Sequence, residues 1–397
     1  MMQRREFLKL LSLIALYSPL ASASNKNSKK ITVIGAGIIG ACIAHELSRL
    51  GQNITIIDKS LPGSGTSGKS FNWVNATYPK KPYSYNYLSQ LGLAAFDDLN
   101  KHIDFPSKWN GSLEWFVDSK KHKKLLNNVN ELLEYPTHSK HEIINSFKAS
   151  LYEPNINFNN NNNIIYSSED GAIDTIKTIE SLLARTKFNG GKIINNCIYK
   201  NSIYRNGKLS SINTSRGEIE TDLIIFATGI NTNSLINKKV LREPTPGIIV
   251  KSKPFKKIIN KIVVGPGIHI HQQNDGKLII GEQDGAPENH KTRLKGYPTQ
   301  FPSTLIADQH FNNMLDQTKL FIKNIGNIEV ESIEIGWRPL PLDGLPIIGF
   351  LNSKQDTYVA TMHSGISLGP IVAKIVAQEI TENINNILLN DFRPSRF

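Results

Sequence analysis

The stretch ITVIGAGIIGACIAHELSRLGQNITIID, from Ile31 to Asp58, decides the fold of this chain. Its β-branched beginning predicts a strand, and the G-x-G-x-x-G spacing of Gly35, Gly37 and Gly40 predicts a tight turn into a helix. In such a unit the first glycine allows the turn, the second lets a pyrophosphate approach the backbone, and the third lets the helix pack closely on the strand. A second apolar run ends at Asp58, where a carboxylate can accept hydrogen bonds from ribose hydroxyls. The complete context favours a βαβ unit that binds an adenine dinucleotide over a glycine turn without a ligand, but it does not indicate which dinucleotide.

A second glycine-rich segment comes next and resembles a different phosphate site. Gly63–Ser70, GSGTSGKS, matches the G-x-x-x-x-G-K-[ST] loop of nucleotide triphosphatases. That loop needs a strand running directly into its first glycine and a helix after its last residue, whereas here residues 59–62 intervene and the residues after Ser70 are interrupted by Pro79 and Pro82. We therefore predict a flexible Gly/Ser loop that borders the dinucleotide site. To that site we also assign three residues of this region, Lys59, Thr66 and Ser67.

Residues 1–23 have the pattern of an export signal. Arg4 and Arg5 precede an apolar stretch from Phe7 to Leu20, and Ala21-Ser22-Ala23 forms a small-residue cleavage site. The apolar stretch is too short to cross a bilayer, which favours a secretory signal over a membrane span. The run RREFLK resembles the twin-arginine export signal of bacteria, although Gln3 stands where Ser or Thr is usual. We expect a periplasmic protein, with an ordinary secretory signal or an uncleaved anchor as the alternatives.

Length and charge limit the architecture and the partners. The chain of 397 residues has room for two or three domains, and its formal net charge of +12 stays positive without the leader. No basic stripe is interleaved with aromatic residues. We therefore expect no nucleic-acid partner and at most peripheral contact with an anionic membrane surface.

The cysteine and histidine patterns predict no metal site. Cys42 lies in the first dinucleotide helix and Cys197 in an expected strand, so we predict two buried thiols, although an oxidising compartment would permit a disulfide. His269 and His271 alternate within an expected strand and should point to one face. Because the sequence offers them no evident third ligand, we interpret them as pocket-lining or surface residues.

The rest of the chain indicates a nucleotide domain in several pieces. Residues 223–229, LIIFATG, form an expected buried strand that meets a glycine turn. From Pro244 to Phe321 short strands, scattered prolines and the hairpin signal Asn274-Asp275-Gly276 indicate a β-rich unit. From Ile333 a strand-and-helix pattern returns. The predicted partition assigns residues 29–80, 145–240 and 330–397 to the nucleotide domain, and residues 81–144 and 241–329 to a substrate-binding domain.

Three dispersed segments together resemble one family. They are VIGAGIIG…IID, DLIIFATG, and GWRPLPLDGLPIIG (Gly336–Gly349) followed by HSGISLGP (His363–Pro370). In these segments the chain resembles the FAD-dependent D-amino-acid oxidase family, most of all its glycine oxidase, sarcosine oxidase and bacterial D-amino-acid dehydrogenase branch. The resemblance covers nearly everything after the leader except residues 79–163. It implies a mixed α/β fold, with a discontinuous Rossmann-like FAD-binding domain of the glutathione-reductase type and an inserted β-rich substrate domain.

The resemblance selects FAD over NAD as the cofactor. In the family, the proline-rich turn and the glycine helix near the C-terminus wrap the isoalloxazine ring. A helix beginning near Gly365 would point its positive end at the flavin and stabilise the negative charge of the reduced ring. We expect FAD to be bound non-covalently, because neither cysteine lies in the matching C-terminal part. The cofactor contacts implied by the resemblance are Ala227, Thr228, Gly229, Gly344, Gly365, Ile366 and Ser367.

The implied reaction is hydride transfer from a carbon that bears an amine, which gives an imine that hydrolyses to a keto acid. This chemistry requires strict placement of a small amino acid or amine, and a planar guanidinium is the best anchor for its carboxylate. Arg338 matches the position of the family's carboxylate-binding arginine. His363 stands close to where glycine-oxidase-like relatives carry an arginine, so we name it as a second substrate contact and leave the substrate open.

Several alternatives remain at this point. The same scaffold serves the oxidation of hydroxy acids and other small alcohols, and a non-catalytic flavoprotein is a third possibility. The electron acceptor is oxygen or a membrane quinone, and the sequence does not separate the two. Trp73 and Asn75 come after the Gly/Ser loop and are candidates both for lining the flavin and for plain core positions.

Overall fold

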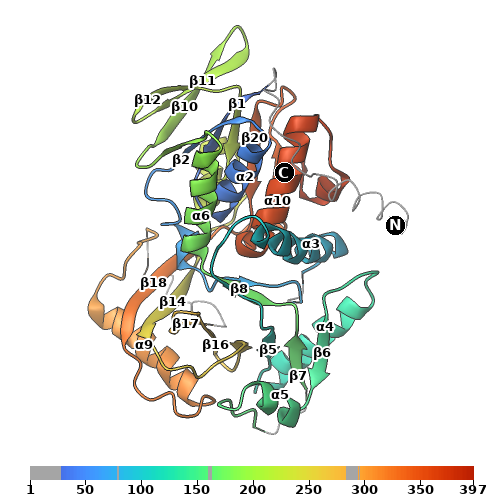
Figure 1. Cartoon of the computed structure of the whole chain (residues 1–397), viewed down its shortest axis with the longest axis vertical. Helices are drawn as coiled ribbons and strands as arrows, with labels where there is room; N and C mark the ends of the chain where they lie inside the picture. The colour runs from blue at the N-terminus through green and yellow to red at the C-terminus, as the bar shows by residue number, and fades with distance from the viewer. Residues whose placement is uncertain (1–27, 78–79, 160–162, 283–293, 295) are drawn as a thin grey trace.

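A six-stranded sheet carries the dinucleotide-binding unit in the computed structural model, which describes residues 28–77, 80–159, 163–282, 294 and 296–397. Its spatial order is β19 (Ile347–Phe350), β20 (Thr357–Thr361), β13 (Leu223–Phe226), β1 (Lys30–Ile34), β2 (Asn53–Ile57) and β9 (Lys192–Ile194). The last five run parallel, and β19 pairs antiparallel with β20. Figure 1 shows this sheet in the upper half of the molecule.

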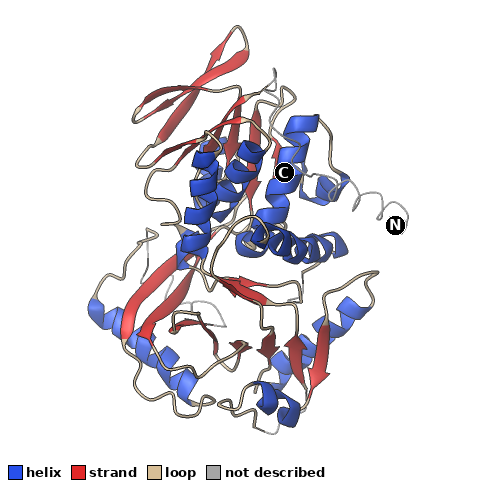
Figure 2. Ribbon diagram, in the orientation of Figure 1, coloured by secondary structure: helices blue, strands red, loops and turns tan. Residues whose placement is uncertain are grey.

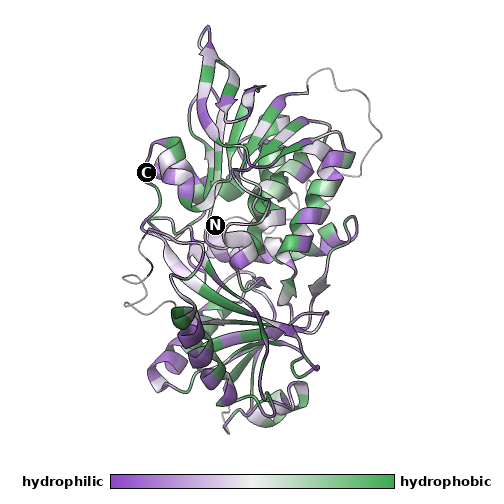
Figure 3. Ribbon diagram, turned by 90° about the vertical axis from the view of Figure 1, so that its left-hand side faces the viewer, coloured by the Kyte–Doolittle hydropathy of each residue, from purple (hydrophilic) through white to green (hydrophobic). Residues whose placement is uncertain are grey.

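The two faces of this sheet are covered by different structures. On one face lie α2 (Ile38–Arg49), α6 (Thr175–Phe188), α10 (Gly365–Glu382) and α3 (Tyr83–Asn100). The other face carries the antiparallel strands β10 (Tyr199–Arg205), β11 (Lys208–Thr214) and β12 (Gly217–Glu220). Figure 2 shows the three layers: the helices, the six-stranded sheet and the small antiparallel sheet. In Figure 3 the strands of the six-stranded sheet are largely apolar. This layering results from strands that are apolar on both faces, as parallel strands are when both faces are buried.

A second, eight-stranded sheet forms the lower half of the molecule in Figure 1. In spatial order its strands are β18 (Val330–Arg338), β14 (Thr245–Pro254), β17 (Lys277–Glu282), β16 (Ile268–Gln272), β15 (Ile262–Val264), β5 (Ser112–Glu114), β7 (Ile164–Ser167) and β6 (His141–Ile144). One face shares a core with α9 (Thr304–Lys319) and α5 (Ser146–Tyr152). On the other face, α4 (Ser119–Leu133) packs on Ile165 of β7.

A small sheet connects the two halves of the molecule. It consists of β3 (Trp73–Val74), β8 (Gly171–Ile173) and β4 (Ser107–Lys108). β3 comes after the single 3-10 turn at Thr66–Lys69, so the strand begins soon after the Gly/Ser loop. The loop is therefore followed by a short strand, and not by the helix that a triphosphatase loop requires.

The mixed α/β fold predicted from the sequence is confirmed, but two segments pair differently from the predicted partition. The partition assigns residues 145–167 to the nucleotide domain, yet β7 pairs with β5 and β6 in the eight-stranded sheet. It assigns residues 330–338 in the same way, yet β18 pairs with β14. β18 finds its partner far away in the sequence, and β7 pairs with β5 and β6, whose residues the partition assigns to the other domain. The strand expected around Cys197 is shorter than predicted: β9 ends at Ile194, before the cysteine.

Several smaller expectations can be compared with the structure. The hairpin at residues 274–276 is confirmed, since β16 and β17 pair antiparallel on either side of it. Cys42 and Cys197 are buried free thiols, as predicted, and burial raises the pKa of Cys42 far above its usual range. Among the described residues, no helix is long and apolar enough to span a bilayer, and no three metal-ligating side chains gather into one group. The leader, residues 1–23, lies outside the described residues.

Candidate functional site

In the dinucleotide turn, neighbouring backbone atoms lie so close to two glycines that neither position can hold a side chain. Gly35 has a φ of +103°, and a Cβ on it would lie 2.4 Å from the carbonyl oxygen of Ala227. A Cβ on Gly40 would lie only 1.9 Å from the carbonyl oxygen of Gly35. The first turn of α2 therefore packs directly on the end of β1, which is the role that the sequence assigned to these glycines.

The N-terminus of α2 and the carboxylate of Asp58 face the same turn. Asp58 Oδ2 accepts a hydrogen bond from the Ala36 amide at 2.7 Å, and its Oδ1 accepts one from the Ser60 amide at 2.8 Å. The first amide of the helix, that of Ile38, donates to Ser67 Oγ at 3.0 Å. The positive end of a helix beside an acceptor for ribose hydroxyls is the arrangement that dinucleotides require. Ser67 thus contacts the N-terminus of α2, and its contact with the cofactor stays a prediction.

We predict that Asp58→Asn weakens cofactor binding about fivefold, because a neutral amide makes weaker hydrogen bonds than a carboxylate by about 1 kcal/mol. Fluorescence titration of the apoprotein with FAD measures the effect. Asp97→Asn, which removes an exposed carboxylate from α3, is the matched control and should bind FAD as the wild type does. If the two variants bound FAD with equal affinity, Asp58 would not contribute to FAD binding.

The predicted second cofactor segment lies next to the glycine turn. Ala227 comes directly after β13, and its amide donates to the Ile34 carbonyl at 2.9 Å. Gly229 has a φ of +53°, and the Thr228 and Thr232 hydroxyls lie 3.1 Å apart. The carboxyl ends of β1, β2 and β13 therefore meet along one edge of the sheet, where ligands of open α/β sheets bind.

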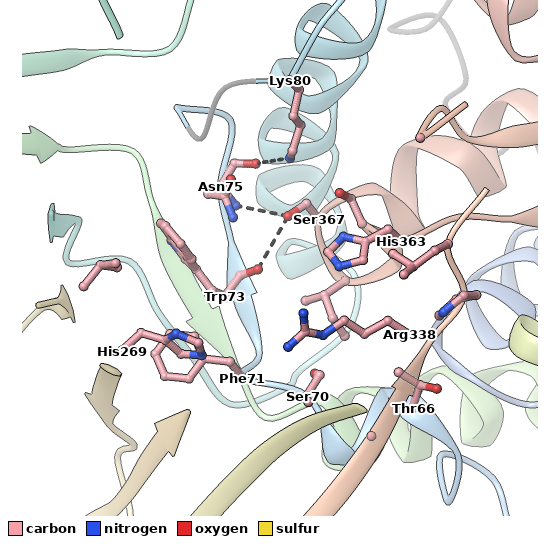
Figure 4. Close-up of a pocket in the computed structure, with 18 of the residues that line it drawn as sticks. Thr66, Ser70, Phe71, Trp73, Asn75, Lys80, His269, Arg338, His363 and Ser367 are labelled. Atoms are coloured by element: carbon pink, nitrogen blue, oxygen red, sulfur yellow. Dashed lines mark hydrogen bonds between the residues drawn. The ribbon is translucent and has the colours of Figure 1, made fainter. Parts of the chain in front are cut away.

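A cavity of about 870 Å³ extends from this region toward the eight-stranded sheet. Figure 4 shows part of its lining. Of the residues that the sequence predicted, those that line it are Thr66, Arg338, Gly344, His363, Ile366 and Ser367. The cavity also has Trp73 and Asn75 in its wall, so both are pocket residues rather than plain core. The other predicted positions do not line it: Gly35, Gly37, Gly40, Asp58, Lys59, Ser67, Ala227, Thr228, Gly229 and Gly365. Lys59 is exposed just beyond β2, and its assignment stays a prediction.

The N-terminus of α10 opens into this cavity. The helix begins at Gly365, as the sequence predicted, and a Cβ on that glycine would lie 3.4 Å from Ile39 of α2. Ser367 Oγ accepts a hydrogen bond from the Asn75 amide at 3.2 Å, which joins the helix to the segment after β3. The N-termini of α2 and α10 thus lie close together, and both offer positive helix ends to a bound anion.

Arg338 enters the cavity from the last residue of β18. Its guanidinium lies against β14 at Gly247, where a Cβ would come within 2.9 Å of Nη2. Figure 4 shows Arg338 and His363 on the same side of the cavity. A planar guanidinium exposed to a cavity is suited to bidentate binding of a carboxylate.

The two cavity histidines are held neutral. Burial, and then the positive charge of Arg338, lowers the pKa of His269 to about 3. Loss of hydration, and then the same positive charge, lowers the pKa of His363 to about 4, although part of this residue is exposed. The ring of His269 packs edge-on against Phe71, with centroids 4.1 Å apart, and His271 packs on the same ring at 4.9 Å. The two histidines of β16 therefore share a face, as predicted. At neutral pH the positive charge around His363 comes from Arg338, Lys80 and Arg242 and not from imidazole.

Sequence reasoning missed several ionisable groups in and beside the cavity, and three of them lie close together. Lys80 is buried and donates to the Asn75 carbonyl at 2.9 Å, and burial lowers its pKa to about 8. Glu114 lines the cavity, and Asp170 lies fully buried beside it, with the pKa of each raised chiefly by burial. Lys80 and Glu114 come from the weakly patterned part of the sequence between residues 79 and 163. No motif marks them, and only the fold brings them to the cavity.

A βαβ turn for a dinucleotide and an adjoining cavity with a cationic anchor define a nucleotide-dependent redox protein. The model of the DAO family, described as FAD dependent oxidoreductase, matches residues 30–379. The chain therefore belongs to this family of FAD-dependent oxidoreductases, and FAD is its cofactor. The close turn at Gly35 and Gly40, Asp58, and the paired helix ends fit such a group.

Named relatives span different substrates. Glycine oxidase of Pseudomonas aeruginosa is 21% identical over 374 residues, covering 88% of this chain and 94% of the relative. Glycerol 3-phosphate dehydrogenase of Caloramator mitchellensis is 26% identical over 283 residues, 63% of this chain and 54% of the relative. The structure of L-proline dehydrogenase from P. horikoshii has a TM-score of 0.80 at 21% identity and covers 94% of this chain and 98% of that one. The chain spans 55% or less of the length of the first curated relatives that it matches.

Proposed function

We propose that the chain oxidises the C–N bond of a small amino acid or amine. FAD, when bound, accepts the hydride from the carbon that carries the nitrogen. Water then adds to the resulting imine, and a keto acid and ammonia, or a substituted amine, are released. The observation that carries this proposal is that Arg338 and the N-terminus of α10 meet in one cavity next to a dinucleotide turn.

The residues of the cavity are suited to distinct parts of this task. Arg338 would hold the carboxylate of the substrate by two parallel hydrogen bonds and so fix the reacting carbon. His363 is neutral because its pKa is lowered to about 4. A neutral imidazole can accept a hydrogen bond from the substrate amine without repelling a positive charge. The positive end of α10 would stabilise the negative charge that reduction places on the cofactor.

An anaerobic titration tests this proposal. The visible flavin absorption is followed while amino acids of both chiralities, glycine, N-methyl amino acids and hydroxy acids are added separately. We expect bleaching by at least one amine and none by the matching hydroxy acid. Bleaching by hydroxy acids alone would replace the proposal with alcohol oxidation, the activity class suggested by the glycerol 3-phosphate dehydrogenase relative. A flavin that no small molecule reduces would favour a non-catalytic flavoprotein.

We also propose that the protein is exported to a periplasm, with oxygen or a quinone as the electron acceptor. Support comes from the paired arginines at positions 4 and 5, the short apolar stretch and the small-residue cleavage site. In cell fractionation, the wild type should appear in the periplasmic fraction, and the double change Arg4→Lys with Arg5→Lys should retain it in the cytoplasm. Equal export of the two would indicate an ordinary secretory signal, and a wild type confined to the cytoplasm would end the proposal.

A further inference from the structure

One wall of the cavity is a row of residues that crosses the eight-stranded sheet. Register places Glu114 of β5 beside Val264 of β15, which lies beside His269 of β16. The row continues through Gly281 of β17 to Ile249 of β14. Residues paired in register share one face of a sheet, and all of these except the glycine line the cavity. Gly281 leaves room for the His269 ring, since a Cβ there would lie 2.2 Å from Nε2.

Glu114 is the unusual member of this row. Glu114 is only 9% exposed, and it lines the cavity. In the described part of the chain, no side chain or amide forms a hydrogen bond or an ion pair with its carboxyl group. Val264 beside it in the sheet is apolar, and burial raises the pKa of Glu114 to about 8, with the nearby charge of Asp170 as the second cause. A buried carboxyl without a partner costs free energy, which a ligand of complementary charge can offset.

The neighbouring ionisable groups are already engaged. Asp170 Oδ2 accepts hydrogen bonds from Ser112 Oγ at 2.6 Å and from Trp73 Nε1 at 3.0 Å. Lys80 donates to the Asn75 carbonyl, and its charge lies near Asp170. Asp170 does not line the cavity, although its Oδ1 has no hydrogen-bond partner among the described residues. Glu282 also lines the cavity, but its Oε1 lies 3.4 Å from His310 Nδ1. Among the described residues, Glu114 is therefore the cavity acid with neither carboxyl oxygen engaged.

Glu114 and Arg338 belong to strands that lie far apart in the eight-stranded sheet. Arg338 ends β18 and Glu114 ends β5, and four strands of the same sheet lie between them. A substrate anchored by its carboxylate on Arg338 would extend along the wall past Ile249 and Val264, whose apolar side chains suit methylene groups. Its far end would then arrive at the carboxyl group of Glu114. The separation favours a long side chain over a short one.

We propose that the preferred substrate is an amino acid with a long side chain that ends in a cation, an ammonium or a guanidinium, and that Glu114 binds this cation. The proposal rests on the proposed amine oxidation and adds the class of side chain. The cation would convert a buried carboxylic acid into a paired carboxylate, the state in which a buried charge is tolerated.

The competing interpretation is an anionic side chain bound by the lysines of α4. Lys121 and Lys124 both line the outer part of the cavity. Lys124 is exposed, however, and an exposed ammonium is hydrated and screened, so it contributes little to discrimination. The buried, unpartnered acid is the stronger determinant.

The test compares lysine and arginine with norleucine and glutamate in anaerobic flavin reduction, using both enantiomers of each. Norleucine is lysine without the terminal ammonium, so the ratio of their dissociation constants isolates the cation. We expect lysine or arginine to bind at least about tenfold more tightly than norleucine, as a charge-assisted hydrogen bond allows. Glu114→Gln should reduce that ratio below about threefold. Glu180→Gln removes an exposed acid from α6, outside the cavity, and should leave the ratio unchanged.

The outcomes separate this inference from the proposed function. If norleucine reduces the flavin and binds as tightly as lysine and arginine in the wild type, the inference fails while amine oxidation stands. A preference for glutamate that Lys124→Gln removes would establish the anionic interpretation in its place. If no amine reduces the flavin, the proposed function itself fails. The wild-type ratio decides the class of side chain even if Glu114→Gln does not fold, and Glu114→Asp, which keeps the charge but shortens the side chain, then tests the role of Glu114.

Discussion

Replacement of Arg338 by alanine is expected to raise the dissociation constant of the substrate about 30-fold or more and to leave FAD bound. Loss of one partner of a buried, hydrogen-bonded charge pair costs about 2–5 kcal/mol, and 2 kcal/mol corresponds to about 30-fold in affinity. The guanidinium lies in the substrate cavity and away from the dinucleotide turn, so the cofactor should be retained. The concentration dependence of the flavin reduction rate in an anaerobic stopped-flow experiment measures the effect.

Arg338→Lys distinguishes charge from shape. A lysine keeps the positive charge but lacks the planar fork, so its affinity should lie between those of the wild type and Arg338→Ala. If lysine restored full affinity, Arg338 would act through long-range charge alone. Unchanged binding in Arg338→Ala would mean that the carboxylate is held elsewhere in the cavity.

Replacement of Gly40 by alanine is expected to abolish FAD binding and to destabilise the protein by about 1–3 kcal/mol or more, the usual cost of overpacking a filled interior. The added Cβ would lie 1.9 Å from the carbonyl oxygen of Gly35, a contact with backbone that no side-chain rotation relieves. The helix must then move away from β1, and this displaces the amides that face the cofactor. Flavin content after gel filtration and the Tm of the purified protein report the two effects.

Gly51→Ala is the matched control. Gly51 lies just beyond the other end of α2 and has a φ of +76°, and a Cβ there would meet nothing within 4 Å. Alanine in that conformation costs about 1–2 kcal/mol of backbone strain, so the Tm should fall while the FAD content stays at the wild-type level. Equal flavin loss in both variants would show that general instability, and not the turn, causes the loss.

The sequence predicted those parts of the molecule whose function depends on local spacing. The turn from β1 into α2, Asp58 at the end of β2 and the start of α10 at Gly365 each depend on residues close together in the chain. Arg338 was found through resemblance, and the fold places it in the cavity. The assignment of Lys59 stays a prediction because adjacency to Asp58 does not fix the direction of an exposed side chain.

The sequence did not predict the far wall of the cavity, for a physical reason. Glu114 acquires its environment from β15, which pairs with β5 across about 150 residues of chain. Its burial and lack of a partner are consequences of that pairing and of the cover by α4, neither of which alters the local pattern around residues 112–114. Pairing across a long stretch of chain also explains why β18 pairs with β14, whose residues were assigned to the other domain.

The most direct test of the central claim is a single anaerobic turnover with quantified products. The purified protein is mixed, in excess, with the amino acid that bleaches its flavin, and ammonia and keto acid are measured against the FAD reduced. Oxidation of a C–N bond predicts one equivalent of each per FAD. Reduction of the flavin without release of ammonia or, for an N-methyl substrate, of the substituted amine would contradict the account, and so would reduction only by a hydroxy acid.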